Sequence, residues 1–124
     1  MDEQDPDSEP MNKVLSRLFQ LQVTAHMAHL QASTLARHLA LDPLYSDLPE
    51  LIDRLAETHQ GLNGPIVGIS MSAADSEDIR LLLDSVRMEL VQARTSIKEG
   101  CLLQILDDID ELMLTTCYKL DRLR

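Results

Sequence analysis

The spacing of the apolar residues constrains the fold of this chain more than any other feature. Apolar side chains recur three and four positions apart through most of the 124 residues, which is the periodicity of helices with one buried face. Only 2% of the residues are aromatic and none is tryptophan, so the core must be aliphatic. Leucine, alanine and methionine favour helices over strands. The pattern predicts an all-α fold.

One long break divides the helical pattern into two halves. Residues 61–74, GLNGPIVGISMSAA, hold three of the four glycines and a proline, which is typical of a connection. Two shorter breaks are expected, at Asp42-Pro43 and at Gly100. A short turn, a long crossover and a second short turn together predict a ferritin-like four-helix bundle, with the long crossover between helices 2 and 3.

The expected helix boundaries follow from these breaks. The first helix is expected from about Pro10 to Ala40, the second from near Ser46 to residues 61–64, the third from near Asp75 or Ser76 to Gly100, and the fourth from there onward. Residues 1–10 carry five of the 21 acidic side chains and two prolines, so an acidic disordered tail is expected there. The bundle domain would then span residues 11–124.

Charge and composition limit the partners. The net charge is −10, and an acidic surface repels phosphate groups but attracts cations, so nucleic acid is not an expected partner. No stretch approaches the roughly 18 apolar residues that would indicate a membrane helix, and the N-terminus lacks an export signal. Cys101 and Cys117 lie too far apart on one expected helix for a disulfide and are expected to be reduced core thiols. These features predict a cytoplasmic protein with no membrane partner.

Five residues could bind a metal ion through imidazole nitrogen or carboxylate oxygen: His26, His38, Asp42, Asp53 and Glu57, at steps of 12, 4, 11 and 4. Asp53 and Glu57 are i,i+4 neighbours on a helix, so their carboxylates can converge on one ion. The apolar stripe of their helix is centred near Leu51, Leu55 and Leu62. The two acids are therefore expected to face away from the core of their own subunit.

The first helix has a second apolar stripe besides its main one: Phe19, Val23, His26 and Leu30, spaced 4, 3 and 4. A helix that is apolar on two sides usually has two partners. We therefore expect a subunit interface that brings His26 of one chain near Asp53 and Glu57 of another.

Each candidate also has a simpler interpretation. His29 and His59 are interpreted as surface or satisfied core histidines. Asp53 and Glu57 alone would form a solvated face, and Asp42 before a proline suits a turn or a helix N-cap. Only the joint spacing favours a metal site over these interpretations.

The spacing of the five ligands resembles the ferroxidase signature of the Dps family, the small ferritins. The segment LIDRLAETHQGLNG (residues 51–64) is similar to that family's Asp, three residues, Glu and glycine-containing helix end. The resemblance implies that His26, His38 and Asp42 of one subunit and Asp53 and Glu57 of its neighbour are both the catalytic residues and the metal ligands. The metal would be iron, Fe(II) oxidised to Fe(III) by hydrogen peroxide or dioxygen.

The resemblance also implies a ferroxidase for iron storage and protection against oxidative stress. The protein would be a homo-oligomer, a dimer at least, with a dodecameric cage as the larger assembly. Two departures keep another hypothesis open: Met27 stands where the family has a tryptophan, and the crossover leaves little room for the family's extra helix. The alternative is a non-catalytic helical bundle that serves oligomerisation or is a virion-associated structural module.

Overall fold

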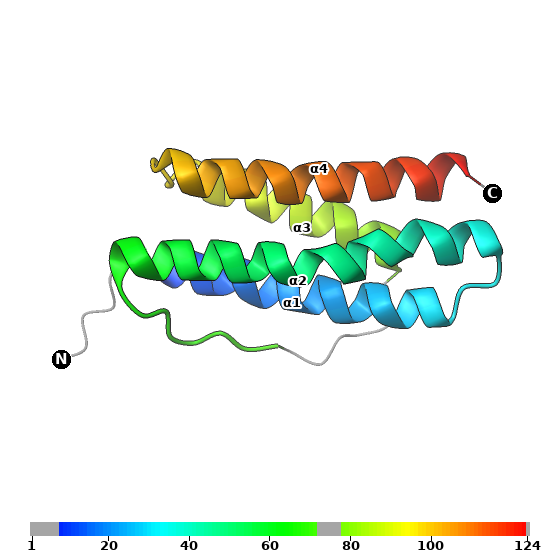
Figure 1. The fold of residues 1–124 in the computed structure, drawn as a ribbon, viewed down its shortest axis with the longest axis horizontal. Helices are drawn as coiled ribbons and strands as arrows, with labels where there is room; N and C mark the ends of the chain where they lie inside the picture. The colour runs from blue at the N-terminus through cyan, green and yellow to red at the C-terminus, as the bar shows by residue number, and fades with distance from the viewer. Residues whose placement is uncertain (1–7, 72–77, 124) are drawn as a thin grey trace.

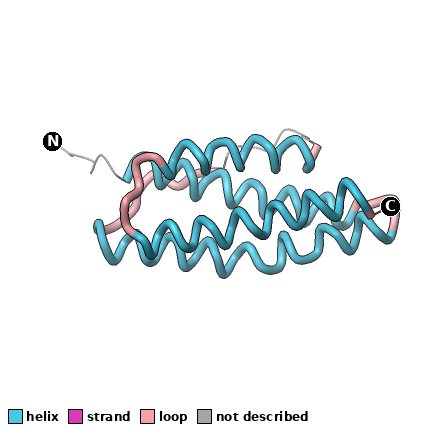
Figure 2. The backbone as a smooth tube through the Cα atoms, turned by 90° about the horizontal axis from the view of Figure 1, so that it is seen from above, coloured by secondary structure: helices cyan, strands magenta, loops and turns pink. Residues whose placement is uncertain are grey.

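The computed structural model describes residues 8–71 and 78–123, which form four helices and no strand (Figure 1). The helices are α1 (Ser8–Leu30), α2 (Leu35–Asn63), α3 (Ile79–Arg94) and α4 (Gly100–Arg122). They lie lengthwise beside one another in two perpendicular views (Figures 1 and 2). The predicted all-α bundle is confirmed.

The connections set the direction of each helix. Short turns join α1 to α2 and α3 to α4, whereas the segment after α2 returns along the length of the bundle (Figure 1). As a result α2 and α3 run in the same direction. Helix α1 packs on α2 and α3, and α4 packs on the same two helices, so packed neighbours are antiparallel. The predicted long crossover is confirmed, while the expected start of the third helix at residues 75–76 lies outside the described residues.

The turn between the first two helices lies earlier than the sequence suggested. Helix α1 ends at Leu30, and Thr34 caps α2, its side-chain oxygen accepting a hydrogen bond from the backbone N–H of Arg37 at 3.1 Å. A threonine N-cap stabilises a helix start by about 1 kcal/mol. The expected break at Asp42-Pro43 is therefore wrong, because a capped start is available eight residues upstream of Asp42.

Two prolines lie inside α2, at Pro43 and Pro49. Each removes one backbone hydrogen bond, and a proline in a helix interior costs roughly 3 kcal/mol. The leucines Leu41, Leu44 and Leu48 beside them are fully buried, and burying a leucine side chain contributes roughly 2 kcal/mol. Tertiary packing therefore holds α2 continuous through both prolines.

The C-terminal ends of α2 and α3 have local causes. Helix α2 ends where Gly64 adopts φ 87°, and its N–H bonds the Gln60 carbonyl at 2.9 Å, as the glycine predicted. Helix α3 ends at Arg94 rather than at Gly100. The hydroxyls of Thr95 and Ser96 donate to backbone carbonyls three residues earlier, which closes the helix end.

The core is aliphatic and is shared by all four helices. Its fully buried members include Leu15, Leu48, Leu83 and Ile109, one from each helix. Both cysteines are free, but only Cys117 is buried, so the expectation of a core thiol is wrong for Cys101. Among the described residues, no helix combines the length and the apolar character needed to cross a membrane.

Candidate functional site

The five expected ligands divide between two places on the surface. His26 lies on α1, whereas the other four lie on α2, which is one continuous helix. With a rise of 1.5 Å per residue, Asp42 and Asp53 are about 16 Å apart along its axis. Asp42 and Asp53 of one chain therefore cannot bind the same ion.

The first place is the corner where α1 turns into α2. We call its residues the histidine corner: His26, His29, His38, Asp42 and Tyr45. His29 and His38 face each other across the turn, with ring centroids 3.7 Å apart and an interplanar angle of 26°. The Nδ1 of His29 lies 2.7 Å from the carbonyl oxygen of His38, and the Nδ1 of His38 lies 3.0 Å from that of His29.

These two bonds set the tautomer of both rings. A carbonyl oxygen only accepts hydrogen bonds, so each Nδ1 must carry the ring proton. In a neutral ring with this tautomer, the lone pair is on Nε2, which is the form in which a histidine binds a metal. Metal-ligating histidines are commonly oriented by such a bond from the other ring nitrogen. His38 is therefore held ready to offer its Nε2.

Tyr45 links two of the expected ligands. Its ring stacks on that of His26, with centroids 4.2 Å apart and planes 5° from parallel. Its hydroxyl lies 3.5 Å from the Nε2 of His29. A hydrogen bond to Asp42, followed by burial and the charge of Asp42, raises the pKa of Tyr45.

His29 and Tyr45 belong to the histidine corner but are not among the five expected ligands. His29 follows His26 by three residues and Tyr45 follows Asp42 by three, spacings that place each pair on one helix face. That signal was present in the sequence. The two spacings indicate one common site only if the chain turns at residues 31–34, because that turn brings the two helix faces together.

The second place is the acidic pair, Asp53 and Glu57. Both are exposed, while Ile52 and Leu55 of the same turns are buried, so the prediction that the acids face away from the core is confirmed. Among the described residues neither acid forms an ion pair, and their neighbour Arg54 lies 3.6 Å from Asp108 instead. The pair is therefore uncompensated negative charge, which attracts cations.

Several acids on α3 and α4, in contrast, pair with arginines. Asp107 pairs with Arg94 at 2.6 Å, and Asp110 pairs with Arg87 at the same distance. These partners lie on α3 and α4, so the contacts stabilise the packing of that helix pair.

The second apolar stripe of α1 lies on the surface of the chain. Val23 is 37% exposed and Leu30 is 69% exposed, while Phe19 is half-buried. His26 lies in the same row and is exposed. An exposed apolar row of this kind marks a surface on which another protein can pack.

The described part of one chain does not assemble a metal centre. Within residues 8–71 and 78–123, no three histidine, cysteine, aspartate or glutamate side chains converge so that they could hold a metal ion. The length of α2 separates the histidine corner from the acidic pair, and the described side chains of the histidine corner do not converge on an ion by themselves. Any site that uses both halves needs a second copy of the chain.

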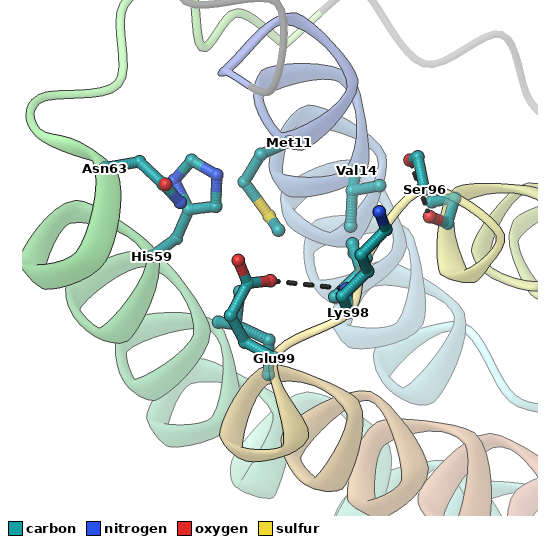
Figure 3. A pocket seen from close by; sticks show the side chains of 10 residues that line it. Met11, Val14, His59, Asn63, Ser96, Lys98 and Glu99 are labelled. Carbon is teal, nitrogen blue, oxygen red and sulfur yellow. Dashed lines mark hydrogen bonds between the residues drawn. The ribbon is translucent and has the colours of Figure 1, made fainter.

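A pocket of about 220 Å³ lies at the opposite end of α2 (Figure 3). His59 lines it, is only 2% exposed and has no hydrogen-bond partner at its Nδ1. The interpretation as a surface or satisfied core histidine is therefore wrong for His59, whereas it is right for His29. The carboxylate of Glu99 faces the same pocket and accepts the Lys98 backbone N–H at 3.3 Å (Figure 3).

Comparison with known proteins identifies relatives without an assigned activity. The chain is 30% identical over 114 residues to a protein of Enterobacteria phage T4, described as an uncharacterized 14.6 kDa protein in the mobD-ri intergenic region. The alignment covers 88% of this chain and 86% of the phage protein. No solved structure matches the chain.

A family model matches residues 29–120, which include the last two residues of α1, all of α2 and α3, and α4 as far as residue 120. Four of the five expected ligands lie in the matched region. His26 lies just before the matched region. The family carries the description of a family of unknown function, DUF5856. The chain belongs to this family.

Proposed function

We propose that this protein is a ferroxidase whose iron site closes between two copies of the chain. Fe(II) is the substrate, and hydrogen peroxide or dioxygen is the oxidant. One copy contributes His26, His38 and Asp42 to each site, and the other contributes Asp53 and Glu57. Carboxylate oxygens stabilise Fe(III) more strongly than Fe(II), because the higher charge interacts more strongly with them, and so they favour oxidation.

The observation that carries the proposal is the separation of the two half-sites along α2. A two-fold axis perpendicular to α2, passing beside the helix at the level of Pro49 between two antiparallel copies, relates the two ends of the helix pair. It brings the acidic pair of each copy to the histidine corner of the other and forms two equal sites. The exposed row of Val23 and Leu30 supports this arrangement, because the same contact would cover it.

Each ligand has a distinct task in the proposed site. His38 offers the Nε2 that its bond to His29 leaves free, and the exposed ring of His26 supplies a second nitrogen. Asp53 anchors one iron, and Glu57 can bridge to a second. Asp42 supports a second, weaker position. In a closed shell the Fe(III) product would be stored as a mineral, which protects against oxidative stress by removing Fe(II) from reaction with peroxide.

The direct test is the rate of Fe(II) oxidation under hydrogen peroxide. The wild-type protein is expected to exceed the buffer blank, and Asp53→Asn is expected to lose most of that excess. Glu111→Gln is the control, because Glu111 is an exposed acid on α4 with no part in the proposed site. A wild-type rate equal to the blank would exclude the ferroxidase.

A second candidate is a bundle that uses the same surface only to assemble, as a structural module. The exposed apolar residues at the helix corner favour it, with Leu35 at 71% and Leu39 at 56% exposure. The same experiment separates the two candidates. Stable oligomers that oxidise no Fe(II) above the blank would favour the structural module.

A further inference from the structure

We propose that the pocket lined by His59 binds a small aliphatic amine in its protonated form. The pocket has a volume of about 220 Å³ and lies where the start of α1, the last turns of α2 and the turn between α3 and α4 come together. It lies at the end of α2 opposite the histidine corner. The inference therefore goes beyond the proposed ferroxidase and does not depend on it.

The size and the walls of the pocket suit a short hydrocarbon chain. Met11, Val14 and Leu102 are buried and line it with apolar surface. A cavity of about 150 Å³ holds a benzene molecule, so this pocket has room for roughly six to ten non-hydrogen atoms. The flexible thioether of Met11 can adapt to chains of different shape. The pocket therefore fits a small ligand with an apolar part.

His59 gives the pocket a buried polar group. Its side chain is 2% exposed, and its Nδ1 has no hydrogen-bond partner within the described residues. An unpartnered buried group of this kind lowers stability, and in a native protein it calls for an explanation. The ring lines the pocket and is turned toward Met11 (Figure 3). A neutral imidazole has one nitrogen that accepts a hydrogen bond, so an N–H group of a ligand can supply the missing partner.

The charges around the pocket favour a cation. The carboxylate of Glu99 faces the pocket, and among the described residues it accepts one hydrogen bond, from the Lys98 backbone N–H at 3.3 Å (Figure 3). A carboxylate has acceptor sites for several more. Helix α2 ends beside the pocket at Asn63 without a basic residue in its last turn, so the negative end of its dipole is not compensated. The net charge of −10 also attracts cations.

Lys98 carries the opposing charge at the rim of the pocket. The residue is exposed, so its ammonium group can stay in solvent while its hydrocarbon stem covers the pocket. The positive end of α4 begins at Glu99, whose own negative charge offsets it. A bound anion would instead pair with Lys98. Removing the charge of Lys98 or of Glu99 should therefore have opposite effects on ligands of opposite charge.

The test uses the full-length, metal-free protein and three probes of equal chain length. Hexylamine, 1-hexanol and hexanoate are a cation, a neutral molecule and an anion near neutral pH. Calorimetric titration measures each affinity. Nuclear magnetic resonance of the histidine rings locates the binding, and the signals of His59 are identified by their absence in His59→Leu.

Glu99→Gln and Lys98→Gln each remove one charge from the pocket. Glu111→Gln and Lys119→Gln are the matched controls, because they make the same charge changes on α4 outside the pocket. Circular dichroism checks the helical content of all four variants. Since the protein holds no iron in these measurements, their outcome is separate from that of the ferroxidase test.

We expect hexylamine to shift the His59 signals saturably and to bind at least about tenfold more tightly than 1-hexanol or hexanoate. Glu99→Gln should weaken hexylamine binding about threefold and Lys98→Gln should strengthen it by a similar factor, with no change in the two controls. No saturable shift at His59 would overturn the proposal. Equal binding of 1-hexanol would indicate an apolar cavity only, and tighter binding of hexanoate that Lys98→Gln weakens would indicate an anion pocket. Either result would overturn it too.

Discussion

His29 and His38 close the α1–α2 turn by bonding each other's backbone. Each Nδ1 bonds the carbonyl oxygen of the other residue, at 2.7 and 3.0 Å, and the two rings stack. The bond from His38 satisfies the carbonyl of His29 in the last turn of α1, where carbonyls lack intrahelical partners. The protein thus orients the free Nε2 of His38 before any ligand binds.

Replacing His29 should destabilise the corner. His29→Ala removes a buried ring, its stacking on His38 and the bond from its Nδ1 to the His38 carbonyl, which we expect to lower the free energy of unfolding by about 1–3 kcal/mol. The bond from His38 to the backbone carbonyl of residue 29 remains possible. His26→Ala is the control: its ring is exposed, and we expect a loss below about 1 kcal/mol. Urea denaturation of the metal-free protein, followed by circular dichroism, measures both. Equal losses would contradict a special role for the His29–His38 pair.

Mixing two inactive variants should restore ferroxidase activity if the site is shared. His26→Ala and Asp53→Ala each disable both sites of a homodimer, but a mixed dimer retains one site built from two intact halves. Random reassembly should therefore recover about a quarter of the wild-type excess rate. The measurement is peroxide-driven Fe(II) oxidation after joint unfolding and refolding. Mixtures that stay at the level of the separate variants would indicate that the halves do not meet between copies.

The two thiols should differ strongly in reactivity. Burial raises the pKa of Cys117, which lowers its reactive thiolate fraction, while Cys101 is exposed at the start of α4. A maleimide reagent is expected to modify one thiol per folded chain and two after denaturation, as counted by mass spectrometry. Cys101→Ser should abolish the fast reaction. Rapid labelling of Cys117 in the folded protein would mean that the α3–α4 packing opens readily.

The stabilising contribution of the Arg80–Asp121 ion pair should be lost at low pH. The Nε of Arg80 lies 2.9 Å from Asp121, and this hydrogen bond lowers the pKa of Asp121 below its ordinary value of 3.8. A lowered folded-state pKa stabilises the folded protein above the ordinary value, and this contribution is lost as the pH falls through the lower one.

The stability difference between the wild type and Asp121→Asn should therefore be full near neutral pH and shrink below pH 3.8. Thermal unfolding across this range measures it. Asp47→Asn is the control, since Asp47 is exposed and forms no ion pair within the described part of the chain. A difference independent of pH would show that the charge of Asp121 does not contribute.

Removing the unpartnered histidine of the pocket should stabilise the fold. His59→Leu replaces a buried imidazole, whose Nδ1 lacks a partner, with an apolar side chain among Met11, Val14 and Leu102. An unsatisfied buried polar group costs about 1–3 kcal/mol, so the variant should unfold at higher denaturant concentration. Asn63→Ala serves as a control on the pocket rim. Destabilisation by His59→Leu would indicate that the ring does form a bond, for example to bound water.

The helical fold could be predicted because local patterns specify it. The three-and-four spacing, Gly64 after α2 and the glycine-containing crossover all act within a few residues, and the structure has the corresponding helices and long connection. The helix break could not be predicted in the same way. Pro43 predicts a helix break because proline lacks a backbone N–H. The helix continues through it because Leu41 and Leu44 are buried in the tertiary core.

The candidate site could be predicted only in part from the sequence, and the rest depended on the tertiary structure. The sequence by itself determined the ligand types and their spacing, and it predicted correctly that Asp53 and Glu57 face away from the core, since helical periodicity alone sets the face of a residue. Only the tertiary structure decided that His29 and Tyr45 join the histidine corner, because residues on two helices meet according to where the chain turns. It also decided that the histidine corner and the acidic pair are about 16 Å apart on one rigid helix, a distance that no side chain can bridge.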